Sequence, residues 1–171
     1  MTFFPELNIM IIVLLSGVIT AFVGILFGLP SLRIKGFYLA VATLASQFFI
    51  IWLFNKVPWF YNYSDTGQIT VSERTMFGVA VTGANAPPYA TYLFCLILVV
   101  VLGFAAKNMI RSKIGRSWMA IRDMDIAAEI IGVSPLKTKL SAFAISSFYI
   151  GIAGSLYFAV YLGALEVTES F

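Results

Sequence analysis

Four long stretches without a charged residue divide the chain, and each is mainly apolar. They cover residues 7–32, 36–55, 75–106 and 140–165. A helix of about 20 residues crosses a hydrocarbon core about 30 Å thick, so each stretch accommodates one spanning helix. The predicted spans are residues 9–29, 37–54, 89–106 and 140–165, and Ser134-Pro135 is a favoured helix start ahead of the last of them. We therefore predict an all-α, polytopic membrane protein with four transmembrane helices.

The composition supports a membrane protein and excludes several kinds of site. Of the 171 residues, 60% are hydrophobic and 11% are charged, whereas soluble domains carry about 25% charged residues. The chain has no histidine and a single cysteine, Cys95, so an internal disulfide, the usual zinc sites and a histidine base are excluded. Because no acidic or basic residue lies inside the predicted spans, we expect no intramembrane enzyme, no metal and no cofactor.

The basic residues predict the orientation in the bilayer. Nine of the eleven lie in the first and third connections, which two spans place on the same side: Arg33, Lys35, Lys107, Arg111, Lys113, Arg116, Arg122, Lys137 and Lys139. Cytoplasmic loops carry an excess of Lys and Arg. The connection 107–139 is therefore predicted to be cytoplasmic and the loop 55–88 to face outward. This arrangement accounts for the net charge of +3, and we predict a lipid bilayer and no nucleic acid as partner.

Small and polar residues inside the spans predict helix contacts. Small residues recur every three or four positions in the first span, at Gly17, Ala21, Gly24 and Gly28, and in the last, at Ser147, Gly151, Ser155, Ala159 and Gly163. This spacing lets helix backbones approach closely, in plain packing or at a moving interface. Thr43 and Gln47 lie one turn apart in the second span, where they bond a neighbouring helix or line a polar substrate path. In the outward loop, residues 68–71 and 77–81 are candidate short strands.

The cytoplasmic connection has a helical pattern of its own. Trp118, Ile121, Met124 or Asp125, Ala128 and Ile131 recur at helical spacing, which predicts one amphipathic helix, and Gly132 is its predicted left-handed cap. The pair Ala127-Ala128 would present a small-residue patch that fits a groove on another protein. The alternative is a helix that lies on the lipid surface.

Three stretches resemble the permease subunits of branched-chain amino-acid (LIV-type) ABC transporters, in particular the M-type subunit. They are GLPSLRIKGFYLAVATLA at residues 28–45, GRSWMAIRDMDIAAEIIGVSPLKTKLSAF at residues 115–143, and GIAGSLYF at residues 151–158 with ESF at residues 169–171. They occur in the order seen in the family. The family is about twice as long as this chain, so we expect the 171 residues to be part of a longer permease.

The resemblance implies that residues 107–139 form a coupling loop of the EAA type, which docks on an ATP-binding subunit. Ala127, Ala128 and Gly132 match the alanines and the glycine of that motif. Its leading acidic position falls on Ile126, between Asp125 and Glu129, so which acid contacts the motor stays open. Work from ATP hydrolysis would pass through the segment that begins at Arg116 and ends at Gly132.

The resemblance also implies the activity and the partners. It implies a permease subunit of an ABC importer for branched-chain amino acids in a bacterial or archaeal cytoplasmic membrane. The partners would be ATP-binding cassette subunits, a second permease subunit and a periplasmic or lipid-anchored substrate-binding protein. The chain has no G-x-x-x-x-G-K-[ST] phosphate loop, so hydrolysis belongs to a partner and the chain is not an enzyme. Asp65-Thr66-Gly67-Gln68 replaces a Gly-Gly turn common in the family, which keeps a urea or short-chain amide permease as an alternative. A non-transporting membrane scaffold is the other.

Overall fold

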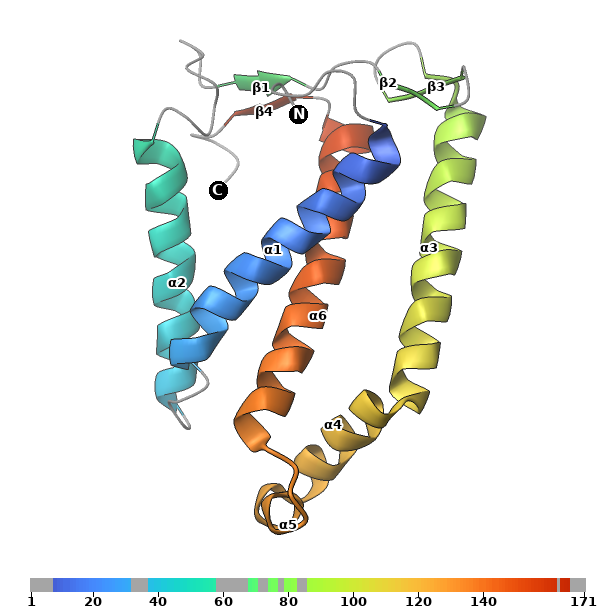
Figure 1. Cartoon of the computed structure of the whole chain (residues 1–171). Helices are drawn as coiled ribbons and strands as arrows, with labels where there is room; N and C mark the ends of the chain where they lie inside the picture. Colours follow the sequence, from blue (N-terminus) through green and yellow to red (C-terminus); the bar gives the residue numbers. More distant parts are fainter. Residues whose placement is uncertain are drawn as a thin grey trace.

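The computed structural model describes residues 8–31, 37–57, 68–70, 74–76, 79–82, 86–162 and 164–166. Four long helices run between the two ends of the molecule (Figure 1). One end carries the short strands, and the opposite end carries two short helices. The helices are α1 (Ile9–Ser31), α2 (Phe37–Lys56), α3 (Pro88–Arg111), α4 (Lys113–Asp123), α5 (Asp125–Ile130) and α6 (Pro135–Tyr157), which a π-helical turn (Phe158–Leu162) extends. The strands are β1 (Gln68–Thr70), β2 (Arg74–Met76), β3 (Val79–Thr82) and β4 (Ala164–Glu166).

Three of the described helices are long and apolar enough to cross a membrane. They cover Ile9–Pro30, Pro88–Arg111 and Pro135–Leu162. The fourth predicted span coincides with α2, in which the stretch Val41–Lys56 is a shorter apolar helix among the fully described residues. Lipid leaves backbone groups unpaired unless the segment is helical, so these apolar runs form helices along their whole length. The chain is therefore a multi-pass membrane protein.

Helix α1 crosses α6 closely because glycines remove side chains at the contact. A Cβ atom on Gly17 would lie 2.9 Å from side-chain atoms of Phe148 and Ile152, and one on Gly151 would lie 3.0 Å from the Gly17 Cα. The Ser16 hydroxyl donates a 3.2 Å hydrogen bond to the Gly151 carbonyl across the same contact. The spacing of small residues predicted close helix contacts for both spans, and the structure shows that these two helices contact each other.

A small apolar core joins α1 and α6 to α3 and β3. Its buried members are Ile9, Val13, Val81, Phe94 and Ile152. Two hydrogen bonds fix α3 in place: the Tyr149 hydroxyl of α6 donates to the Leu102 carbonyl at 3.0 Å, and the Thr91 hydroxyl donates to the Val81 carbonyl at 3.0 Å. The core lies near the strand end of the bundle.

The strands form two antiparallel pairs, and one of them corrects the prediction. β2 pairs with β3, and β1 pairs with β4 in the register Gln68 to Glu166. The predicted last span continued to residue 165, but the helix ends at Leu162 and Ala164–Glu166 forms β4. Partnering of β4 depends on β1, almost a hundred residues earlier, and local hydropathy carries no sign of it. Of the predicted strands, residues 71 and 77–78 lie outside the described residues.

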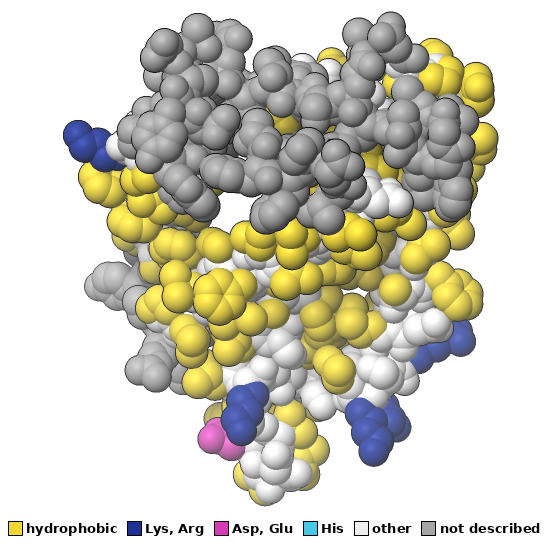
Figure 2. All heavy atoms as spheres, turned by 45° about the horizontal axis from the view of Figure 1, so that its top comes forward, with side chains coloured by type: hydrophobic (Ala, Val, Ile, Leu, Met, Phe, Trp, Pro, Cys, Tyr) yellow, Lys and Arg dark blue, Asp and Glu magenta, His cyan; other side chains and the backbone are white. Residues whose placement is uncertain are grey.

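The outer surface of the long helices is apolar, as a lipid-facing surface requires. Figure 2 shows a broad hydrophobic band across the helices, with Lys and Arg side chains beyond it at the end that carries α4 and α5. Among the described basic residues, Lys56 is at the opposite end, where α2 terminates. Arg33 and Lys35, which the orientation argument also used, lie outside the described side chains.

Candidate functional site

The connection between α3 and α6 is a folded tip made of two short helices. The predicted single amphipathic helix is wrong at Met124, which adopts an extended conformation (φ −151°, ψ 98°) and separates α4 from α5. Backbone bonds cap both sides of this break: the Met124 N–H donates to the Ala120 carbonyl at 3.1 Å, and the Ala128 N–H donates to the Met124 carbonyl at 3.0 Å. The chain therefore turns sharply without leaving these groups unpaired.

The inner face of the tip packs on the first turns of α6. Ile121 and Ala128 are buried. The Trp118 indole N–H donates a 2.9 Å hydrogen bond to the Ser141 hydroxyl on α6. The Ser141 hydroxyl in turn donates to the Thr138 carbonyl at 2.7 Å. Helix α4 is thereby attached to α6 by a large ring and a directed bond.

A salt bridge attaches α5 to the same helix. Lys139 Nζ lies 2.6 Å from Asp125 Oδ2, with both side chains about half exposed. At the other end of α5, Gly132 adopts φ +89°, and its neighbour Val133 donates its N–H to the Ala128 carbonyl at 2.9 Å. A left-handed glycine closes a helix in this way because it has no Cβ to clash. The predicted cap at Gly132 is confirmed.

The outer face of the tip is an exposed apolar patch that sequence reasoning missed. We call it the apolar tip, and its side chains are 69% exposed at Met124, 78% at Ile126, 82% at Ile130 and 75% at Ile131. Ala127 is exposed beside it, whereas Ala128, predicted to share the docking patch, is 2% exposed and faces inward. Ile126 and Ile130 are four residues apart on one helix and share a face. The sequence signal for this patch is Ile-Ala-Ala-Glu-Ile-Ile at residues 126–131. It can be recognised only when a new helix is known to begin at Asp125.

Charged residues surround the apolar tip. Arg116 and Glu129 are exposed, and no ion pair involves either of them within the described part of the chain. Asp125 is already paired with Lys139. In Figure 1, α5 lies at the extreme end of the molecule, past the last turn of α3. The tip therefore presents large aliphatic side chains with a free acid and a free base nearby.

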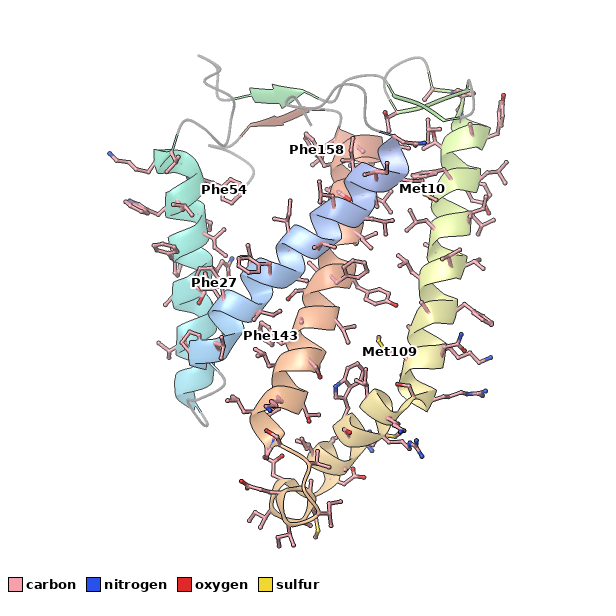
Figure 3. All side chains as sticks on the ribbon, viewed as in Figure 1. Met10, Phe27, Phe54, Met109, Phe143 and Phe158 are labelled. Atoms are coloured by element: carbon pink, nitrogen blue, oxygen red, sulfur yellow. The ribbon has the colours of Figure 1, made fainter. Side chains whose placement is uncertain are left out.

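The two polar residues predicted in the second span line a groove between α1, α2 and α6. Its volume is about 640 Å³. The polar lining residues are Thr20, Thr43, Ser46, Gln47 and Ser147, and apolar walls come from Val23, Phe27, Ile50, Ile51 and Phe143. Figure 3 labels Phe27 and Phe143, which come from α1 and α6 near the end of α1 that approaches the tip. The structure thus brings Thr43 and Gln47 together with hydroxyl groups from two other helices.

Comparisons with known proteins relate the sequence to a family of transport proteins. Residues 2–168 match the family described as branched-chain amino acid transport system / permease component. Two relatives, from Salmonella typhimurium (strain LT2) and Escherichia coli (strain K12), are each the high-affinity branched-chain amino acid transport system permease protein LivM. Each is 32% identical over 165 residues, which cover 85% of this chain. The matched region spans 38% of the length of each relative. No solved structure matches the chain. The chain belongs to the family of permease components of branched-chain amino acid transport systems.

Proposed function

We propose that this chain forms part of the permease subunit of an ABC importer that carries branched-chain amino acids across a bacterial or archaeal cytoplasmic membrane. The observation that carries the proposal is the apolar tip, exposed at one end of the bundle yet attached to α6 by Trp118 and Lys139. Membership of the permease family supports transport as the activity. Transport against a gradient needs work, and the ATP-binding cassette subunits that supply it are partner chains.

The membrane topology follows from the same picture. Helices α1, α2, α3 and α6 are the four spans, and α4 and α5 face the cytoplasm. The described basic residues of the third connection lie at the tip end, in accordance with the positive-inside rule. The strand end then faces outward, where a periplasmic or lipid-anchored substrate-binding protein docks. A second permease subunit completes the pathway.

The apolar tip is the surface that enters a groove on the ATP-binding subunit. Its isoleucines are too large and too exposed to stay bare in water, because burying each one stabilises an interface by about 1.5–3 kcal/mol. Of the acids left open by the sequence, Asp125 is held by Lys139, so Glu129 is the acid that faces the motor, with Arg116 as the second charged contact. Ala127 lies against the motor surface, and Ala128 and Gly132 fix the shape of α5.

Movement of the motor reaches the membrane through α6. Trp118 and Asp125 attach the tip to Ser141 and Lys139. Ser147, against which Gly24 of α1 packs, follows Ser141 by six residues, which is about 9 Å along a helix at 1.5 Å per residue. A shift of the tip is therefore transmitted over a short, stiff distance to the α1–α6 contact that borders the groove.

Site-directed cross-linking tests the proposal. In a Cys95→Ala background, which removes the only cysteine of this chain, Ile130→Cys is cross-linked in the full-length permease with its partners present. Val99→Cys, exposed on the outer face of α3, is the matched control. We expect Ile130→Cys, and not Val99→Cys, to form an adduct with the ATP-binding subunit. Equal adducts at both positions, or none at Ile130, would remove the coupling assignment and favour a scaffold.

A further inference from the structure

The groove between α1, α2 and α6 has a lining without any charged side chain. All its lining residues are neutral, and they include four hydroxyl groups and an amide: Thr20, Thr43, Ser46, Ser147 and Gln47. Such a site has no opposite charge to pair with a charged solute, so transferring a solute with a net charge from water into it is strongly unfavourable. The desolvation cost is much lower for a solute whose charges cancel and whose two charged ends can each be hydrogen-bonded. The groove therefore favours a net-neutral solute that carries polar ends.

The polar groups of the groove divide into hydrogen-bond acceptors and donors. The Thr20 hydroxyl donates to the Ser16 carbonyl at 2.8 Å, and the Ser46 hydroxyl donates to the Ala42 carbonyl at 2.8 Å. Each hydroxyl already donates its hydrogen to a carbonyl of its own helix, so it can act toward the groove only as a hydrogen-bond acceptor. An ammonium group, which has three donors and no acceptor, is the ligand that such oxygens suit.

Two other groups in the same groove retain their donors. The Gln47 amide and the Ser147 hydroxyl make no hydrogen bond within the part of the chain that the structure describes. An amide N–H and a hydroxyl are suitable partners for a carboxylate, and hydrogen bonds to a charged group are stronger than neutral ones. The groove thus carries partners for both ends of a zwitterion.

The remaining walls of the groove suit an aliphatic body. Val23, Ile50 and Ile51 are aliphatic, and Phe27 and Phe143 are aromatic. The volume of about 640 Å³ lies within the range of about 300–1,000 Å³ typical of small-molecule sites. An α-amino acid with a branched aliphatic side chain matches the walls, the size and the polar groups together.

We infer that this groove is a binding site for a zwitterionic aliphatic α-amino acid, with the carboxylate on Gln47 and Ser147 and the ammonium on Thr20 and Ser46. The inference rests on the proposed function and locates its substrate path. Ser147 belongs to α6, the helix that also holds the tip, so the same element contacts both the substrate and the motor. The polar side chains of the groove would then bind substrate in addition to packing between helices.

The test measures leucine uptake and ATP hydrolysis in the same proteoliposomes, which contain the full-length permease, its ATP-binding subunits and saturating loaded receptor. Gln47→Leu and Ser147→Ala are compared with Asn55→Leu and Ser155→Ala, which lie outside the groove. We expect the two groove variants to lower the leucine moved per ATP hydrolysed at least about tenfold, since each removes a hydrogen bond to a charged group, and the controls to leave it unchanged. Unchanged transport in both groove variants overturns the site. Absence of ATP-dependent leucine uptake in the unmodified complex overturns the proposed function instead.

A second measurement does not depend on the transport cycle. Gln47→Cys is introduced in the Cys95→Ala background and labelled with a water-soluble thiol reagent, with and without free leucine. We expect leucine to slow the labelling at least about threefold when it is present at twice its dissociation constant or above, because only unoccupied groove reacts. Leucinamide (a cation) and 4-methylpentanoate (an anion) at the same concentration should give no protection, and Asn55→Cys should be unaffected by leucine. Protection by urea or by either charged analogue to the same extent as by leucine overturns the zwitterion assignment.

Discussion

The contact between Gly24 and Ser147 gives a sharp prediction about what holds α1 against α6. A Cβ atom added to Gly24 would lie 2.7 Å from the Ser147 Cβ and would overlap its hydroxyl oxygen. Ordinary carbon–carbon contacts are about 3.5–4.0 Å. A rotamer change moves the hydroxyl away but leaves the Ser147 Cβ in place, so the two helices must separate by about 1 Å to restore that spacing.

Gly24→Ala is therefore expected to destabilise the protein. Inserting a methyl group into a close contact costs about 1–3 kcal/mol, while alanine gains up to about 1 kcal/mol over glycine in a helix. The net loss is about 1–2 kcal/mol. Gly154→Ala, on α6 with no atom within 4 Å of its added Cβ, has the helix gain without the clash and should be neutral or slightly stabilising.

The assay is reversible unfolding of the full-length permease in mixed micelles, arranged as a double-mutant cycle. Ser147→Gly removes both clashing atoms, so Gly24→Ala combined with Ser147→Gly should recover much of the loss. The expected coupling free energy lies between about 0.5 and 3 kcal/mol in favour of the double variant. If Gly24→Ala is as stable as Gly154→Ala, or if Ser147→Gly gives no rescue, the close crossing of α1 and α6 is wrong.

Three further changes test how the tip is attached. Trp118→Phe keeps an aromatic side chain but removes the indole N–H that donates to Ser141; the lost hydrogen bond should cost about 0.5–1.5 kcal/mol, measured as faster amide hydrogen exchange over α4. Lys139→Gln breaks the pair with Asp125; because that pair is half exposed, we expect a loss of less than about 1 kcal/mol in thermal unfolding, which shrinks further in high salt. Gly132→Ala forces a Cβ into φ +89° and should cost about 1–2 kcal/mol, read as faster exchange over α5.

Each of these changes has a matched control. Trp52→Phe alters an exposed indole on α2, and Lys137→Gln removes an exposed ammonium two residues before Lys139. Gly103→Ala adds a Cβ to a helical glycine with open space around it. The controls should leave exchange at the tip unchanged. A tip variant that behaves like its own control would show that the corresponding contact does not hold the tip on α6.

Much of the fold could be predicted because lipid imposes simple rules on a chain. A charged residue inside the hydrocarbon core is costly, so the uncharged stretches alone located α1, α2, α3 and α6. Small residues at four-residue spacing are a local pattern that indicates close helix contact, and Gly17 and Gly151 lie at that contact. The cap at Gly132 was predictable because glycine is the residue that a left-handed helix end favours.

The details that sequence reasoning missed depend on distant partners. No proline or glycine marks the break at Met124; the inward packing of Ile121 and Ala128 and the pair between Asp125 and Lys139 accompany it. Continuing one helix across the break turned Ala128 outward in the prediction and gave Ile126 no place on the exposed surface. The pair Ala127-Ala128 had predicted a small-residue surface, whereas the exposed surface consists of Met124 and three isoleucines. Large aliphatic side chains would also suit a helix that lies on lipid, but α5 lies beyond the last turn of α3, which favours the protein partner proposed above.

Only part of the groove's polar lining could be predicted from the sequence. Thr43 and Gln47 were recognisable as polar residues one turn apart in an apolar helix, but Thr20 and Ser147 join them only because α1 and α6 cross where glycine permits. Hydroxyl groups in apolar helices are common and ordinarily bond their own backbone, as Thr20 and Ser46 do. Sequence could not separate these acceptors from the donors of Gln47 and Ser147.

ATP-driven uptake tests whether the apolar tip couples this permease to an ATPase, as we propose. The measurement is leucine uptake by proteoliposomes that contain the full-length permease and its partners. The test variant combines Ile126→Asp and Ile130→Asp. The control is Ile114→Asp, at an exposed apolar position on α4 outside the apolar tip. Loss of two isoleucines that the proposed interface would bury should weaken binding of the ATP-binding subunit by more than about 100-fold and abolish uptake, while Ile114→Asp retains it. Undiminished ATP-driven uptake in the double variant, with the protein correctly inserted, would show that the apolar tip does not couple the permease to its motor.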